Sequence, residues 1–199
     1  MNGLLLTSYV ALWLLVLVLA GAVLALYHHF GTMYLSSREG RATQGPAIGS
    51  RLSGFGASAL DGTEIAVPSG RPSLLLLAST DCPECGRLQE PLVRLARAHA
   101  GEVDVVVLCG GRRVEVSDWA RGVGAPVRVV ADRNFRRATA VGVGITPFLL
   151  GVDGDGVVRA RGLVNGQEGL EMALHDLLHA GEDGAAPVGG MAVVGSAAR

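Results

Sequence analysis

Hydrophobic residues form two patterns along the chain, and the first is one long apolar run near the N-terminus. Residues 4–26 contain no charged side chain. At about 1.5 Å per residue, a helix of this length would extend roughly 34 Å, enough to cross a hydrocarbon core about 30 Å thick. No Lys or Arg precedes the run, and it exceeds the apolar core of a signal peptide. It therefore predicts a retained transmembrane helix within residues 1–30, in contact with the lipid bilayer.

The second pattern, over residues 57–180, alternates short apolar runs with amphipathic stretches, as in βαβ units packed on a sheet. The uninterrupted run at 74–78 predicts a strand that is buried on both faces. Further strands are predicted at 103–108, 127–131, 148–153 and 157–161. Helices are predicted at 83–99, with a kink at Pro91, and at 114–121, 134–141 and 167–179.

Two segments without sustained periodicity flank this predicted α/β domain. Residues 31–56 are rich in Ser, Gly, Arg and Ala and are interpreted as a linker. Residues 181–199 are rich in Gly and Ala and are predicted to be a disordered tail. The expected organisation is therefore a membrane anchor, a linker, one domain and a tail.

The overall charge of the chain excludes one class of partner. Charged residues make up 18% of the chain, and the formal net charge is −1. Proteins that bind nucleic acids usually carry an excess of positive charge on one face. We therefore expect no nucleic-acid partner.

The main chemical signal is Cys82-Pro83-Glu84-Cys85, placed where the run at 74–78 ends and a helix begins. Two thiols at this spacing can close a reversible disulfide. The first would lie at the helix N-terminus, where free N–H groups and the helix dipole stabilise a thiolate. Cys82 is therefore the candidate nucleophile, and Cys85 the thiol that resolves a mixed disulfide.

Metal sites are the main alternative for these residue types. A four-ligand zinc site needs a second pair of ligands, and the remaining cysteine, Cys109, falls in a predicted strand as a small buried side chain. His175 and His179 lack the glutamate of an HExxH motif, and the Asp153–Asp155 turn lacks the later acidic ligands of a calcium loop. We predict no metal and no cofactor.

A second motif, Thr146-Pro147, precedes a predicted strand about 60 residues after the cysteines. Together the two motifs resemble the thioredoxin superfamily, and the apolar run, the Ile-Thr-Pro segment and the stretch 153–165 resemble its membrane-anchored TlpA-like and MauD-like members. The resemblance implies a thioredoxin-like fold with a central mixed sheet flanked by helices. It also implies that the Thr146–Pro147 bond is cis and that both residues line a substrate groove beside the cysteines.

This sequence departs from thioredoxin at two positions near the cysteines. Leu76 stands where thioredoxin has a buried carboxylate, and Asp81 stands where it has Trp. Proton transfer from Cys85 would then depend on Glu84, Asp81 or water, and both acids should oppose formation of the Cys82 thiolate. The function expected from the motifs is thiol–disulfide exchange. A non-catalytic scaffold and a peroxiredoxin-like peroxidase are the alternatives.

The resemblance also implies a compartment and partners. Arg38 and Arg41 follow the apolar run, and charge alone would place the domain in the cytoplasm. Members of the MauD-like group act outside the cytoplasm, and large domains translocate largely regardless of charge. We therefore expect a single-pass protein of the cell membrane with an extracytoplasmic domain. Its expected partners are client proteins that carry thiols or disulfides, and a redox partner in the membrane.

Overall fold

The computed structural model describes residues 3, 7–9, 11–21, 23 and 44–180. Among these residues, no helix is both long enough and apolar enough to span a membrane. Parts of the predicted span (4–6, 10, 22 and 24–26), the predicted linker up to residue 43 and the predicted disordered tail lie outside the described residues. The chain divides into two compact units, Met1–Ala42 and Thr43–Arg199, and every element below belongs to the second.

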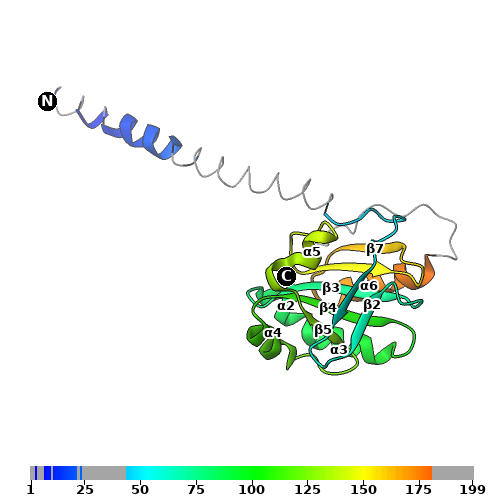
Figure 1. Cartoon of the computed structure of the whole chain (residues 1–199). Coiled ribbons are helices and arrows are strands. Elements are labelled where there is room, and N and C mark those ends of the chain that lie inside the picture. The colour runs from blue at the N-terminus through cyan, green and yellow to red at the C-terminus, as the bar shows by residue number, and fades with distance from the viewer. Residues whose placement is uncertain (1–2, 4–6, 10, 22, 24–43, 181–199) are drawn as a thin grey trace. The chain divides into compact units, whose positions relative to one another are not determined.

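A five-stranded mixed sheet forms the centre of the second unit (Figure 1). Its order is β5 (Arg128–Ala131), β4 (Asp104–Gly110), β3 (Ser73–Ser79), β6 (Phe148–Val152) and β7 (Val158–Leu163). The first three strands are parallel, whereas β6 is antiparallel to β3 and β7 is antiparallel to β6. Every position of β3 is buried because its run of leucines supplies apolar side chains to both faces.

Alternate residues of β3 pack into opposite layers of the core. Leu74 and Leu76 belong to a cluster with residues of α3 (Gln89–Ala98), α4 (Arg113–Ala120) and α6 (Gly166–His179). On the other face, Leu75 and Leu77 pack with α5 (Arg136–Ala140) and with a small hairpin. The hairpin consists of β1 (Phe55–Ser58) and β2 (Glu64–Val67), which pair antiparallel. The sheet is therefore covered on both faces.

The helix predicted at 83–99 is divided into two, and the predicted kink at Pro91 is wrong. Helix α2 (Pro83–Arg87) ends at Leu88, and α3 begins immediately afterwards. Pro91 lies in the first turn of α3, where a residue without an N–H group loses no hydrogen bond within the helix. The first turn of α3 therefore tolerates Pro91.

Residues 44–56, which the sequence assigns to the linker, are bonded to the domain. The Arg161 guanidinium donates to the carbonyl oxygens of Gln44, Gly45 and Pro46 at 3.1–3.2 Å. The Gly45 N–H donates to Gly142, and Leu52 is buried. The compact unit accordingly begins at Thr43.

Candidate active site

The sheet topology brings the ends of several strands to one edge. Because β3, β4 and β5 are parallel, the segments that follow them emerge together, and helices α2, α4 and α5 lie at this end of the sheet, on the left in Figure 1. Strand β6 runs antiparallel to β3 and pairs Phe148 with Leu77. The residues just before β6 therefore reach the same edge.

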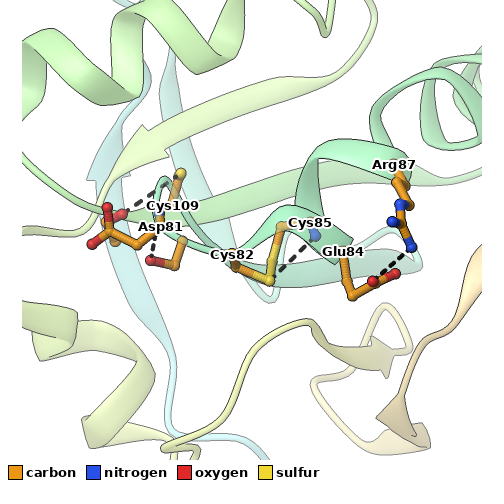
Figure 2. Close-up of a disulfide and its surroundings, with 8 residues drawn as sticks. Asp81, Cys82, Glu84, Cys85, Arg87 and Cys109 are labelled. Atoms are coloured by element: carbon orange, nitrogen blue, oxygen red, sulfur yellow. Dashed lines mark hydrogen bonds and ion pairs between the residues drawn. A yellow bond between two sulfur atoms is a disulfide. The ribbon is translucent and has the colours of Figure 1, made fainter.

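Cys82 and Cys85 are joined in a disulfide at this edge, with Cα atoms 5.3 Å apart (Figure 2). Cys82 is the N-cap of α2, with an extended backbone, and Pro83 opens the helix. The Cys85 N–H donates to the Cys82 Sγ over 3.2 Å. The same N–H also donates to the Cys82 carbonyl at 3.1 Å, so the sulfur and the carbonyl share this backbone donor at the start of the helix.

The two sulfur-bearing residues differ in accessibility. Cys85 is fully buried in the core, whereas Cys82 is only partly buried and packs at its margin. An incoming thiol or disulfide can therefore reach Cys82 and not Cys85. The sequence predicts this order of exposure from the position of each cysteine on the helix.

Two acidic side chains flank the disulfide on opposite sides in Figure 2. Glu84 forms an ion pair with Arg87 at 2.7 Å, and both side chains are exposed. The Asp81 backbone N–H donates to Ser79 Oγ at 3.3 Å, and Asp81 is exposed. Arg87 belongs to no sequence motif and was not predicted as part of the site. It stands one helical turn after Glu84 and offsets its negative charge.

The interior next to the disulfide is apolar. Leu76 is completely buried, as is Cys109 on the neighbouring strand β4, where it pairs with Ala78. Burial raises the pKa of the Cys109 thiol to about 12. Cys109 therefore remains a protonated free thiol at neutral pH, outside the disulfide.

Thr146 and Pro147 immediately precede β6, and the peptide bond between them is cis. Pro147 is buried and Thr146 is half-buried. The Pro147 carbonyl accepts a hydrogen bond from the Val164 N–H at 3.4 Å. Since Phe148 pairs with Leu77, these two residues lie level with the end of β3, the strand that leads to Cys82.

The histidines of α6 and Asp153, the other residues whose types could bind a metal, contact protein groups. The rings of His175 and His179 stack with centroids 4.3 Å apart. Burial alone would raise the pKa of Asp153, but hydrogen bonds from the Val157 N–H and from Arg159 outweigh it and lower that pKa. Within the described residues, no three His, Cys, Asp or Glu side chains are grouped closely enough to hold a metal ion.

Comparison with known proteins shows relatives that match most of the chain. The methylamine utilization protein MauD of Methylobacillus flagellatus is 32% identical over 180 residues, which cover 85% of each chain. The chain belongs to the MauD family. MauD of Methylophilus methylotrophus is 29% identical over 179 residues, covering 85% of this chain and 82% of that protein. No protein-family model matches the chain.

Solved structures show the fold that this MauD family member shares. DsbF of MTB, in mixed oxidised and reduced forms, has a TM-score of 0.55 at 24% identity, covering 62% of this chain and 94% of that one. A thiol:disulfide interchange protein DsbE from Chlorobium tepidum has a TM-score of 0.60 at 17% identity, covering 67% and 97%. The predicted thioredoxin-like fold with a central mixed sheet is thereby confirmed.

Family membership and geometry together give the activity. A Cys-x-x-Cys disulfide heads a helix at the edge of a thioredoxin-like sheet, and one of its two sulfurs is accessible. The chain is a thiol–disulfide oxidoreductase of the MauD family.

Proposed function

We propose that this protein is a membrane-anchored oxidoreductase that exchanges disulfides with cysteines of extracytoplasmic client proteins and so helps them mature. The observation that carries the proposal is the unequal burial of the two sulfurs at the head of α2. In this role Cys82 is the nucleophile, Cys85 is the resolving thiol, and Thr146 and Pro147 form part of the groove that binds the client.

The exchange reaction has two balanced steps. In the reduced protein, the Cys82 thiolate attacks one sulfur of a client disulfide, forms a mixed disulfide and releases the other client sulfur as a thiolate. The Cys85 thiol loses its proton and attacks the Cys82 sulfur, which releases the second client thiolate. Two electrons pass from the protein dithiol to the client disulfide, and the reverse sequence oxidises a client dithiol.

The surroundings of Cys82 favour its thiolate form. The Cys85 N–H, which contacts Cys82 Sγ at 3.2 Å, would donate to the negatively charged sulfur after reduction. A hydrogen bond to the charged form stabilises that form. The ion pair between Glu84 and Arg87 limits the opposing effect of the nearby carboxylate. Asp81 adds an opposing charge, so we expect an intermediate reduction potential.

The proton of Cys85 requires an external acceptor. The core around Cys85 includes Leu76 and Cys109, neither of which can accept a proton as a carboxylate can. Asp81 is exposed, and no side chain among the described residues forms an ion pair with its carboxylate. We assign proton transfer to solvent at this edge, with Asp81, which adjoins Cys82 in sequence and forms no ion pair within the described residues, as the carboxylate that can take part.

We also propose that residues 4–26 anchor the protein in the membrane and that its domain lies outside the cytoplasm. The uncharged run at 4–26 supports a single transmembrane helix, and the relatives carry the name methylamine utilization protein. We propose that the domain faces the outside of the cytoplasmic membrane, receives or delivers electrons through a membrane redox partner, and acts on an enzyme of methylamine use. Topology reporters fused after Ala180 should be active outside the cytoplasm, and activity confined to the cytoplasm would contradict this placement.

Trapping of client proteins tests the assigned roles of the two cysteines. We expect the Cys85→Ala variant, expressed in membranes, to accumulate mixed disulfides with clients because no thiol remains to attack the Cys82–client bond. Cys82→Ala should trap little, because the Cys85 sulfur is buried. Non-reducing electrophoresis with mass spectrometry measures both, and Cys109→Ala is the control that should not trap. Equal trapping by the two active-site variants would contradict the assignment.

A further inference from the structure

Phe135 is held in an unusual backbone conformation at the edge that carries the disulfide. It ends the short 3-10 helix η1 (Arg133–Phe135), and both Asn134 (φ 57°) and Phe135 (φ 52°) have left-handed backbones. Asn tolerates this conformation, but it is strained for a bulky residue such as Phe135. Strain of this kind persists only where surrounding structure imposes it, and it often accompanies function.

Asp132 supplies the structure that imposes this conformation. Its carboxylate is 1% exposed and accepts hydrogen bonds from the backbone N–H groups of Arg137 (3.0 and 3.1 Å) and Ala138 (2.9 Å). The Asp132 N–H in turn donates to the Cys109 carbonyl at 2.8 Å. The loop is therefore fixed at both ends, and Phe135 lies between them.

The fixed loop places the Phe135 ring over Gly110, and Gly110 is bonded to the segment that leads to Cys82. A Cβ atom added to Gly110 would lie 2.2 Å from ring carbons Cε1 and Cζ, so the ring covers the Gly110 Cα. The Gly110 carbonyl accepts from the Thr80 N–H at 3.0 Å, and Thr80 is two residues before Cys82. Phe135 is also 36% exposed, which leaves part of its ring open to a partner.

Exposed arginines accompany the ring at this edge. Arg133 and Arg136 flank Phe135 in sequence, and Arg113 opens α4 three residues after Gly110. Within residues 44–180, no carboxylate forms an ion pair with any of these three guanidinium groups. Other arginines nearby are paired, such as Arg112 with Glu115. The segments that follow β4 and β5 therefore carry three unpaired guanidinium groups together with an exposed aromatic ring.

We propose that Phe135, Arg113, Arg133 and Arg136 form a docking surface for an acidic, extended client segment that flanks the client's reactive cysteine. This inference rests on the proposed function and specifies the chemistry of its client. Complementary charge accelerates encounter, and a partly exposed aromatic ring on a rigid loop is a suitable apolar anchor. A client is favoured over anionic lipid because a bilayer held at this edge would shield Cys82 from every protein substrate.

Model substrates of different charge test the docking surface directly. The full chain in neutral detergent, with its active-site cysteines reduced, is mixed with peptides that share one internal disulfide and differ only in flanking glutamates, glutamines or lysines. We expect the glutamate peptide to be reduced about 10-fold faster than the glutamine peptide at low ionic strength, and the lysine peptide to be slowest. Added salt should remove most of the difference.

Matched variants assign the effect to these residues. Arg133→Gln and Arg136→Gln should each lower the rate with the glutamate peptide about 2–3-fold, and the triple variant with Arg113→Gln should abolish the charge preference. Arg97→Gln removes the same charge from the exposed last turn of α3 and should leave the preference intact. Phe135→Leu retains an apolar side chain and should slow all three peptides less than Phe135→Ala does.

A small neutral substrate distinguishes failure of the docking surface from failure of the proposed function. Hydroxyethyl disulfide should be reduced equally by the wild type and by every arginine variant. If the wild type does not reduce it, the proposed function fails. If it is reduced but the three peptides react equally, the docking surface is wrong and the proposed function stands. Loss of binding to anionic vesicles by the triple variant, without loss of peptide preference, would assign the surface to lipid and overturn the inference.

Discussion

Removal of the Asp132 carboxylate should destabilise the domain by an amount that follows from its contacts. The Asp132→Ala change leaves the backbone N–H groups of Arg137 and Ala138 without their acceptor. Ala138 is 3% exposed, so water cannot readily replace the lost bond there, whereas Arg137 is half-buried. A buried unsatisfied donor costs about 1–3 kcal/mol, and loss of a helix cap about 0.5–2 kcal/mol. These figures describe overlapping losses, so we expect roughly 2–3 kcal/mol in total.

Urea unfolding of the oxidised protein, followed by far-UV circular dichroism, measures this loss as a change in midpoint at constant slope. Asp132→Asn keeps one carbonyl oxygen as acceptor and should lose less stability than the alanine variant. Asp118→Ala is the matched control, because it removes an exposed ion pair with Arg121 and should cost at most about 0.5 kcal/mol. An Asp132→Ala variant no less stable than the Asp118→Ala control would refute the assigned role of the carboxylate.

Two further predictions concern residues beside the disulfide. Gly110→Ala should cost about 1–3 kcal/mol of stability, because the added methyl displaces the Phe135 ring, and the cost should largely vanish in a Phe135→Ala background. A double-mutant cycle by urea unfolding measures this coupling, and additive costs would contradict the contact. The Cys109 pKa is raised to about 12 by burial, so its contribution to stability should be complete below about pH 9 and lost as pH rises further. A Cys109→Ala variant should lack that alkaline loss, whereas equal losses in both proteins would exclude Cys109 as its source.

Strongly patterned elements of the fold could be predicted from sequence. The leucine run of β3 and the amphipathic stretch of α6 carry their own period, and the structure places them within one or two residues of expectation. The β1–β2 hairpin was missed because its strands have four residues each and are half exposed. Asp61-Gly62 between those strands is a turn signal that could have revealed it.

At the candidate site, the sequence alone identified the groups whose chemistry is local. Cys82 and Cys85 are three residues apart. Because Cys82 lies at the start of α2 and Cys85 lies inside it, their order along the helix determines which of them is exposed. Asp132 and Phe135 were missed because their contacts depend on the pairing of β4 with β5, which no local pattern specifies. Their roles follow only from tertiary structure.

The topology of the sheet places the residues that pack the core and the residues of the candidate site in different parts of the chain. The apolar core is built by the strands and by the helices and hairpin that cover them. The disulfide, the Phe135 loop, the start of α4 and Pro147 all lie in segments that begin or end at strand termini. Exposed side chains in those segments can change without altering the packed layers. Client choice can therefore diversify among proteins with this architecture while the redox pair and its supporting sheet stay the same.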